Sequence, residues 1–354
     1  MVALRRNAIN GSSQPRDSNA KGNTTYRSIE IIDILHIIFD NLCMEPLGNR
    51  LRLKELRLID AIAQSGQLAI AAEQLAMTQP AASRMLSGVE KSIGSDVFIR
   101  HPKGMKPTAI GEVLARSAAW LIHGLDRTIE EVEAARTGRA GTVRVGAVTG
   151  GAVAFIVPAI QKLKQNTLGA DIHVDVAPSD VLIDGLQRGE YDFVLSRIPP
   201  GTDARLFNIR RGRVEMMRFL VRAGHPLNPT GPAQLSDLAG YEWIVQAPHT
   251  PMRQAVEDAF ANRQVPLPRE IVNTTSLLVM LAYLASSDAI SPISGEVADL
   301  LGSEHVGGNL RAIEIDDPII VHAYHMVTLK SRVLNPIAVK LRDLVIDVLT
   351  SGIE

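Results

Sequence analysis

The sequence is poor in cysteine and in long apolar runs, and each shortage excludes a class of protein. Its 354 residues include a single cysteine, Cys43. One thiol cannot form a disulfide within the chain. So few cysteines are typical of proteins from a reducing cytoplasm. No run reaches the roughly 18 apolar residues that a transmembrane helix needs. The strongest candidate, residues 29–39, is short and contains three polar side chains, and no signal-peptide cleavage site follows it. The sequence therefore predicts a cytoplasmic protein with no membrane partner.

The chain also lacks a strong net charge: its formal net charge at pH 7 is −1. Its hydrophobic content of 46% and charged content of 21% are those of a soluble globular protein. A length of 354 residues exceeds one typical domain. The charge is distributed unevenly, because residues 50–106 contain nine basic and five acidic side chains, a net charge of +4. This local excess suits contact with phosphates.

Residues 68–94 read as a helix, a tight turn and a second helix. Leu68, Ala71, Ala72 and Leu75 form one apolar face of the first helix. Thr78 stands where the second helix needs an N-cap. The apolar side of that helix carries Ala82, Leu86, Val89 and Ile93.

The other face of the second helix is polar and basic. Such side chains can hydrogen-bond base edges or phosphates in a DNA major groove. The expected DNA contacts on this face are Thr78, Gln79, Pro80, Ala81, Ser83, Arg84 and Ser87. The alternative is an ordinary two-helix corner with a solvated face, because this geometry also occurs in proteins that bind no DNA.

The flanking residues favour the DNA-binding interpretation. Residues 97–99 look like a short strand, and the basic turn that follows would form a wing that grips phosphates through Arg100, Lys103 and Lys106. The run from residue 56 to 114 resembles the winged helix–turn–helix of LysR-type transcriptional regulators. The matching features are the paired alanines 71–72, TQPAASR at 78–84, Glu90 with Gly94, Phe98, Arg100, and Thr108 with Gly111. The resemblance implies an operator or promoter in double-stranded DNA as the partner, with RNA polymerase as a further candidate.

Residues 108–137 show helical periodicity over about thirty residues. A near-heptad apolar seam runs along this helix. The seam consists of Leu114, Ala118, Leu121, Leu125 and Val132. The seam could pack on its own domain, but a helix that joins two domains has little surface of its own chain to cover it. The resemblance implies a linker helix that pairs subunits, giving a homodimer and, by further association, a homotetramer.

From residue 142 onward, strands alternate with helices, which predicts parallel sheet clad with helices. Two such α/β sets in succession resemble the periplasmic-binding-protein-like effector domain of the same family. The predicted fold is therefore multidomain: a winged helix–turn–helix domain of all-α type (51–107), a linker helix (108–138) and a two-lobed α/β domain (142–349). Residues 1–50 are expected to be a disordered or mis-called extension, with Met44 as an alternative start of translation.

Ligands of open parallel sheets bind beyond the carboxyl ends of the strands. Hydroxyl, amide and backbone groups at these positions could bind a small effector. The candidates are Thr149, Gly150, Ser179, Ser196, Arg197, Gln246, Pro248, Thr250 and Thr274. Arg197 is the one cation among them, so an aromatic or aliphatic acid is slightly favoured over a sugar. Asp192 or Asp203 could instead neutralise it.

Catalytic, metal-binding and cofactor motifs are not found, so the sequence predicts no enzyme, no metal and no cofactor. His322 and His325 are three residues apart in an expected strand, and such side chains point to opposite faces. Two alternatives stay open: a cytoplasmic solute-binding protein with a vestigial winged domain, and an enzyme on an α/β fold.

Overall fold

The computed structural model describes residues 51–350, apart from residues 229, 249 and 303–308. The predicted N-terminal extension and the alternative start at Met44 lie outside these residues. No helix in the described part of the chain is long and apolar enough to span a membrane.

The winged domain forms as the sequence predicts. Helix α2 (Leu53–Ser65) ends at Gly66, α3 (Leu68–Gln74) follows, and α4 (Gln79–Ile93) ends at Gly94. Both glycines adopt the left-handed conformation that closes a helix. Strands β1 (Phe98–His101) and β2 (Gly104–Pro107) pair antiparallel and form the wing. The core of this domain includes Leu58, Ile59, Ala71, Ala82 and Leu86.

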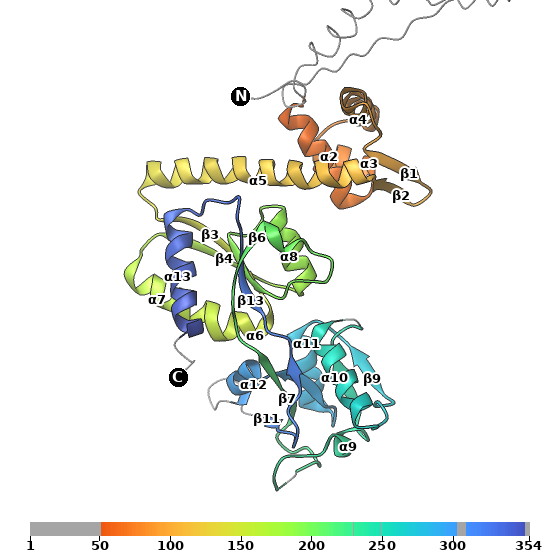
Figure 1. Ribbon diagram of the computed structural model, residues 1–354, viewed down its shortest axis with the longest axis vertical. Helices are drawn as coiled ribbons and strands as arrows, with labels where there is room; N and C mark the ends of the chain where they lie inside the picture. Colours follow the sequence, from red (N-terminus) through yellow and green to blue (C-terminus); the bar gives the residue numbers. More distant parts are fainter. Residues whose placement is uncertain (1–50, 229, 249, 303–308, 351–354) are drawn as a thin grey trace, which may run out of the picture. The chain divides into compact units, whose positions relative to one another are not determined.

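Helix α5 (Ala109–Thr137) is 29 residues long and begins at Thr108, whose hydroxyl accepts a hydrogen bond from the Gly111 amide at 3.0 Å. Figure 1 shows it as one continuous yellow helix. Its buried face consists of Gly111, Ala115, Ala118, Ala119 and Ile122.

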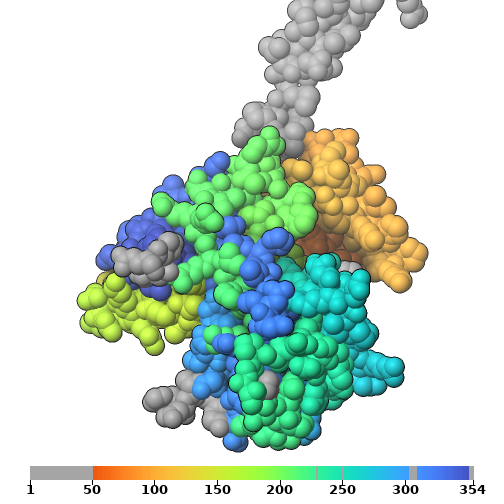
Figure 2. All heavy atoms as spheres, turned by 60° about the horizontal axis from the view of Figure 1, so that its bottom comes forward, coloured from red at the N-terminus to blue at the C-terminus, as the bar shows by residue number. Residues whose placement is uncertain are grey.

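The first lobe is built on a five-stranded sheet in the order β4-β3-β5-β13-β6. Its strands are β3 (Gly141–Ala147), β4 (Ala170–Val176), β5 (Phe193–Ser196), β6 (Phe207–Arg210) and β13 (His325–Leu329). Its helical segments are α6 (Thr149–Gly151), a π-turn (Ala152–Ile156), α7 (Val157–Asn166), α8 (Ser179–Gln187), a 3₁₀ turn (Ala204–Leu206) and α13 (Pro336–Thr350). Strand β3 is parallel to β4 and β5, whereas β13 is antiparallel to β5 and β6. The space-filling view accordingly shows blue residues from late in the chain beside green residues of this lobe (Figure 2).

The second lobe is organised around β7 (Glu215–Arg222), which pairs with β10 (Ser291–Ser294), β11 (Leu310–Ile313) and β12 (Ile320–Val321). The parallel pair β8 (Trp243–Val245) and β9 (Ile271–Asn273) lies beside them. The helices are α9 (Leu235–Leu238), α10 (Pro251–Asn262), α11 (Leu277–Ser286) and α12 (Gly295–Gly302). Trp243, Phe219 and Phe260 form edge-on aromatic pairs in its core.

The sequence predicts one strand that contains His322 and His325, and this prediction is wrong for residues 319–329. The structure divides this segment between the lobes, because β12 pairs with β7 in lobe 2 and β13 pairs with β5 and β6 in lobe 1. The chain crosses between lobes here and again between β6 and β7. The two crossings touch, since a Cβ added to Gly212 would lie 1.9 Å from the carbonyl oxygen of Tyr324.

Candidate functional site

The recognition face of α4 is positioned by its N-cap and its buried side. The Thr78 hydroxyl accepts a hydrogen bond from the Ala81 amide at 3.4 Å, and Ala82, Leu86 and Val89 are buried in the domain core. The side chains of Gln79 and Arg84 are exposed and make no hydrogen bond or ion pair with any described residue. Pro80 and Ser87 are also exposed, whereas Ala81 and Ser83 are half-buried. Free Gln and Arg side chains on one exposed face suit base contacts.

The wing is fixed to α4 by polar contacts. A carboxylate oxygen of Glu90 accepts hydrogen bonds from the amides of Val97 (3.1 Å) and Phe98 (3.4 Å). Arg100 donates a long hydrogen bond of 3.5 Å to Ser83, from the wing to the recognition face. Lys103 and Lys106 are exposed on the wing. The hairpin therefore holds two free ammonium groups beside α4, where phosphates of a bound duplex could reach them.

The exposed apolar residues of α5 agree only in part with the predicted seam. Leu121, Leu125 and Val132 are exposed as expected. Ala118 is fully buried within its own chain, and Leu114 packs against the core of the winged domain, because this face covers α2. The predicted seam did not include Ile110, Val113 and Ile129, which are also exposed. We define the linker stripe as the exposed residues Ile110, Val113, Leu121, Leu125, Ile129 and Val132.

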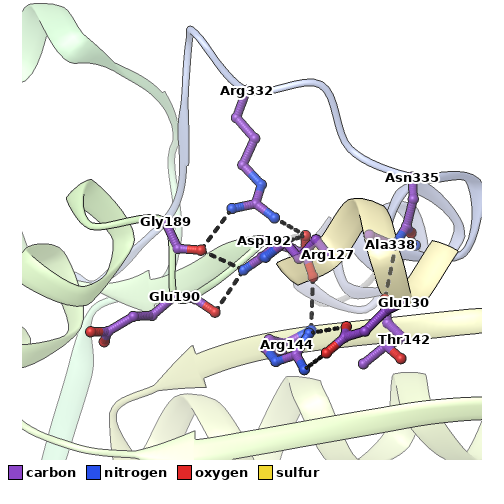
Figure 3. A network of polar contacts seen from close by, with 10 residues as sticks. All are labelled: Arg127, Glu130, Thr142, Arg144, Gly189, Glu190, Asp192, Arg332, Asn335 and Ala338. Carbon is purple, nitrogen blue, oxygen red and sulfur yellow. Dashed lines mark hydrogen bonds and ion pairs between the residues drawn. The ribbon is translucent and has the colours of Figure 1, made fainter. Parts of the chain in front are cut away.

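The buried carboxylate of Asp192 joins helix α5 to lobe 1, a contact that the sequence did not indicate (Figure 3). Asp192 is 2% exposed and accepts hydrogen bonds at 2.7 Å from both Arg127 and Arg332. Arg127 also donates to the carbonyl oxygens of Gly189 (2.6 Å) and Glu190 (2.7 Å). Asp192, which the sequence offered as a possible partner of Arg197, therefore pairs with Arg127 and Arg332 instead.

A second pair beside Asp192 links the same two elements. Arg144 of β3 binds Glu130 of α5 through two hydrogen bonds, at 2.8 and 2.7 Å. These bonds lower the pKa of the Glu130 carboxyl below its ordinary value. The Arg144 amide in turn donates to Asp192 at 2.8 Å. We call Arg127, Glu130, Arg144, Asp192 and Arg332 the Asp192 network (Figure 3).

The candidate effector residues of lobe 1 come together at the end of β5. The Ser196 hydroxyl donates to the Ser179 carbonyl oxygen at 3.3 Å, and the Ser179 hydroxyl accepts from the Arg197 amide at 3.3 Å. Ser196 is fully buried, so its hydroxyl is enclosed by its own lobe. Thr149 and Gly150 begin α6 at the end of the neighbouring β3.

The candidates of lobe 2 form a separate group. Thr274 follows β9 and donates its amide to the carbonyl oxygen of Val245, at the end of β8, at 2.8 Å. The hydroxyls of Thr250 and Thr274 bond to nearby backbone, at 2.9 and 3.1 Å. Gln246 is half-buried and Pro248 is exposed. No hydrogen bond among the described residues joins this group to Ser179, Ser196 or Arg197.

Arg197 instead has partners that the sequence did not indicate. Its guanidinium pairs with Glu215, the first residue of β7, and donates to the His322 carbonyl oxygen at 2.6 Å. It also lies 5.8 Å from the ring centroid of Tyr324. Asp203, the other predicted partner, binds Arg205 at 2.9 Å. Arg197 thus joins the end of a lobe 1 strand to both crossings.

Other polar groups gather around the same carboxylate. A Cβ at Gly150 would lie 2.7 Å from Glu215 Oε1, 2.9 Å from Ser294 Oγ and 3.3 Å from Glu296 Oε2. Three side chains associated with lobe 2 therefore converge on the backbone of a lobe 1 turn. We call Arg197, Glu215, Ser294, Glu296 and Tyr324 the interlobe cluster.

Burial, together with the negative charge of Glu215, raises the pKa of the Glu296 carboxyl above its ordinary value. A raised pKa means that the folded state binds more protons than the unfolded state between the two values, so stability falls as pH rises through that range.

Glu296→Gln should therefore raise the melting temperature at pH 7–8. This gain should vanish below about pH 4, where the unfolded carboxyl is also protonated. A gain independent of pH would contradict this explanation, and Glu131→Gln, at an exposed position, provides the control.

The described residues also form a pocket of about 440 Å³ on lobe 2, between α10 and residues 317–322. Arg263 and Asp317 in its wall pair with each other. No predicted effector residue lines this pocket. The described residues contain no group of three or more His, Cys, Asp or Glu side chains placed to hold a metal ion.

Comparisons with known proteins agree with this architecture. Residues 53–112 match the family model for bacterial regulatory helix-turn-helix proteins of the lysR family, and residues 136–350 match the LysR substrate binding domain. The HTH-type transcriptional regulator GbpR of Rhizobium radiobacter is 37% identical over 71% of this chain and 84% of its own. GbpR of Azospirillum brasilense is 33% identical over 82% of this chain and 84% of its own.

Among solved structures, full-length CbnR in complex with its target DNA shares the fold. Its TM-score is 0.58 at 18% identity, over 84% of this chain and all of that one. The two family models and the CbnR structure thus match both the helical DNA-binding domain and the two-lobed α/β domain. The chain belongs to the LysR family and is a DNA-binding transcriptional regulator with an effector-binding domain.

Proposed function

We propose that this regulator reads its operator with the exposed face of α4 and grips the adjoining phosphates with the β1–β2 wing. The observation that carries the proposal is the free Arg84 and Gln79 on α4, beside a wing that carries Lys103 and Lys106. Base contacts by the helix supply sequence specificity, whereas the wing lysines supply affinity that depends on salt.

A small metabolite bound at the interlobe cluster would control this activity. The cluster joins residues of both lobes at the two crossings, so a ligand there can favour one arrangement of the lobes over another. Arg197 of the cluster directly follows β5, and Asp192, which binds α5, directly precedes it. A conformational change at the cluster could therefore alter the position of the linker helix. That shift would change the spacing of the paired winged domains and the bending of the bound DNA.

The linker stripe would pair two copies of the chain. Six exposed apolar side chains follow one side of α5, with Val113, Ile129 and Val132 each at least 59% exposed. Contiguous exposed apolar surface of this kind marks a protein contact site. A second copy offers the same stripe, so an isologous homodimer covers both, and a homotetramer would form from two such dimers.

Enzymatic activity is not part of this proposal, because the relatives that match the chain are transcriptional regulators. RNA polymerase is a candidate partner at the promoter. A regulator acting on bacterial DNA would be located in the cytoplasm. The solute-binding alternative is not favoured, because the winged domain keeps a free basic recognition face.

Replacing Arg84 by alanine should weaken binding to a specific operator by about 1–3 kcal/mol if the guanidinium makes a bidentate base contact. Fluorescence anisotropy with fragments that flank the gene, against a scrambled duplex, measures this effect. Lys91→Ala, at the other end of the same helix, is the matched control. Unchanged affinity and specificity in folded Arg84→Ala protein would exclude this face as the reader.

Lys103→Ala and Lys106→Ala should act differently from Arg84→Ala. Each removes an expected phosphate contact, so binding should weaken for specific and scrambled duplexes alike. The slope of log K against log salt should fall by about 1 for each lost contact. A loss confined to the specific duplex would mean that the wing reads bases.

Leu121→Asp should shift the protein toward the monomer, because it places a charge without a partner in the apolar stripe. Sedimentation velocity measures the shift. Arg116→Asp is the control, since Arg116 is exposed on the same helix but outside the linker stripe. An unchanged oligomer in Leu121→Asp would show that copies pair through another surface.

A further inference from the structure

The pocket on lobe 2 is large enough for a small ligand. Its volume is about 440 Å³, and small-molecule sites measure roughly 300–1,000 Å³. One wall is the extended segment 317–322, and the other is one face of α10. The α10 residues that line the pocket recur at helical spacing, and they are Pro251, Gln254, Ala255, Asp258, Ala259 and Asn262. The two alanines keep this wall open, because a methyl group leaves space that a longer side chain would fill.

A row of three polar side chains runs along the α10 wall. Gln254, Asp258 and Asn262 are each four positions apart, so they lie on one side of the helix, about one turn from each other. None of the three side chains makes a hydrogen bond or an ion pair with any described residue. The carboxylate of Asp258 is flanked by two amide groups whose oxygens accept hydrogen bonds. The row therefore offers free acceptors around one negative charge.

The described lining of the pocket has no free arginine or lysine to neutralise Asp258. Arg263 is the one such residue in this lining, and it pairs with Asp317. Arg263 also donates to the carbonyl oxygens of Ala259 (3.3 Å) and Asp317 (2.9 Å). Helix α10 ends at Asn262, and the carbonyl end of a helix dipole favours positive charge. A cation therefore fits this pocket better than a carboxylate.

The opposite wall supplies apolar surface. Pro318, Ile319 and Ile320 line it, and Ile320 is 60% exposed. Ala255 and Ala259 lie on the α10 wall of the same pocket. A methylene chain bound between the walls would remove apolar surface of the ligand and of the protein from water. The lining thus matches a molecule with a cationic head and a short aliphatic stem.

We propose that this pocket is a second ligand site, which binds a small aliphatic amine. The ammonium group donates to the Asp258 carboxylate and, with its remaining hydrogens, to the amide oxygens of Gln254 or Asn262. The stem packs between the alanines of α10 and Ile320. The site goes beyond the proposed function, because none of its lining residues belongs to the interlobe cluster.

The segment 317–322 connects the pocket to the interlobe cluster. Val321 of β12 pairs with Glu215 of β7. His322 lines the pocket, and its carbonyl oxygen accepts a hydrogen bond from Arg197 at 2.6 Å. A ligand that binds this segment more tightly in one arrangement of the lobes shifts the equilibrium toward that arrangement. The amine can therefore regulate the protein without entering the interlobe cluster.

Titration calorimetry of the full chain with n-pentylamine, 1-pentanol and pentanoate tests the site, because these probes share a chain and differ in their head group. The amine is expected to bind about tenfold or more tightly than the alcohol, and pentanoate is expected not to bind. Asp258→Asn, which is nearly isosteric, should raise the Kd of the amine about tenfold or more. Ala255→Leu fills the pocket and should abolish amine binding. Glu270→Gln, at an exposed carboxylate of lobe 2 outside the pocket, is the matched control.

Two results would overturn the site. An amine that binds no more tightly than the alcohol or pentanoate contradicts a cationic ligand. A Kd that is unchanged in Asp258→Asn, or that rises equally in Glu270→Gln, places the amine elsewhere. If Ala255→Leu does not fold, Asp258→Asn still decides the question.

Operator affinity measured with and without saturating n-pentylamine tests the link to the lobes. The amine should change the operator affinity of the wild type about fivefold or more, and it should not change that of Asp258→Asn. An amine that binds the pocket and leaves operator affinity unchanged overturns the regulatory link. The calorimetry needs no DNA, so loss of the site and failure of the proposed function give different results.

Discussion

Replacing Asp192 by alanine is expected to destabilise the protein by about 3–5 kcal/mol, the cost of leaving buried charges without their partner. Arg127 and Arg332 both bind this carboxylate at 2.7 Å, and their side chains are only 15% and 11% exposed. Without Asp192, two guanidinium groups remain in a poorly solvated site. Urea denaturation followed by circular dichroism measures the loss.

Two further variants show whether the effect belongs to the network. Glu133→Gln breaks a pair with Arg136 on the same helix, where both side chains are more than half exposed, and should change stability little. Asp192→Asn keeps hydrogen-bonding atoms but not the charge, so it should also be strongly destabilising. If Asp192→Ala unfolds at the same urea concentration as Glu133→Gln, the network does not stabilise the contact between α5 and lobe 1.

Replacing Gly111 by alanine is expected to disrupt the packing of α5 against the wing. A Cβ at this position would lie 2.0 Å from the carbonyl oxygen of Val97, which is backbone and cannot rotate away. Overpacking of this kind costs about 1–3 kcal/mol or more. The same contact positions β1, so DNA affinity should fall together with stability.

Gly124→Ala provides a control of the opposite sign on the same helix. No atom lies within 4 Å of a Cβ at Gly124. Alanine is favoured over glycine in a helix interior, so this variant should gain about 0.5–1 kcal/mol. Equal effects of the two substitutions, measured by denaturation, would show that the approach of Gly111 to Val97 does not constrain the domain.

The winged domain could be predicted from the sequence because its determinants are local. Thr78, Gly94 and the spacing of Ala82, Leu86 and Val89 act within one or two turns of helix. The same holds for the parallel strands of lobe 1, whose alternation with helices is visible along the chain. The wing also follows from a short basic turn between two strands.

The functional groups of the effector domain could not be predicted in the same way, because their partners are distant in sequence. Arg197 binds Glu215, 18 positions away, and the carbonyl oxygen of His322, 125 positions away. Asp192 binds Arg332, 140 positions away. The sequence offers only nearby aspartates as possible partners of Arg197, whereas the fold returns the chain to lobe 1 after residue 322 and brings in different residues.

The linker helix shows a third outcome. Its length and its apolar side are clear from periodicity, but periodicity does not show where along the helix that side is covered. Ala118 and Ile129 lie on the same side of α5, because 11 residues are close to three full turns. Ala118 is buried by its own chain, whereas Ile129 lies beyond the buried residues 111–122 and is exposed. The packing of α2 against α5 decides which residues on this side are free.

Selection from a pool of random DNA duplexes tests the central claim most directly. The full-length protein is incubated with the pool, and bound duplexes are recovered and sequenced over several rounds. The free face of α4 predicts that one sequence motif is enriched by the wild type and by Lys91→Ala, and that Arg84→Ala loses or alters the preference at a defined base. Enrichment of no motif by the wild type, or of the same motif at the same strength by Arg84→Ala, would contradict this account of how the protein reads DNA.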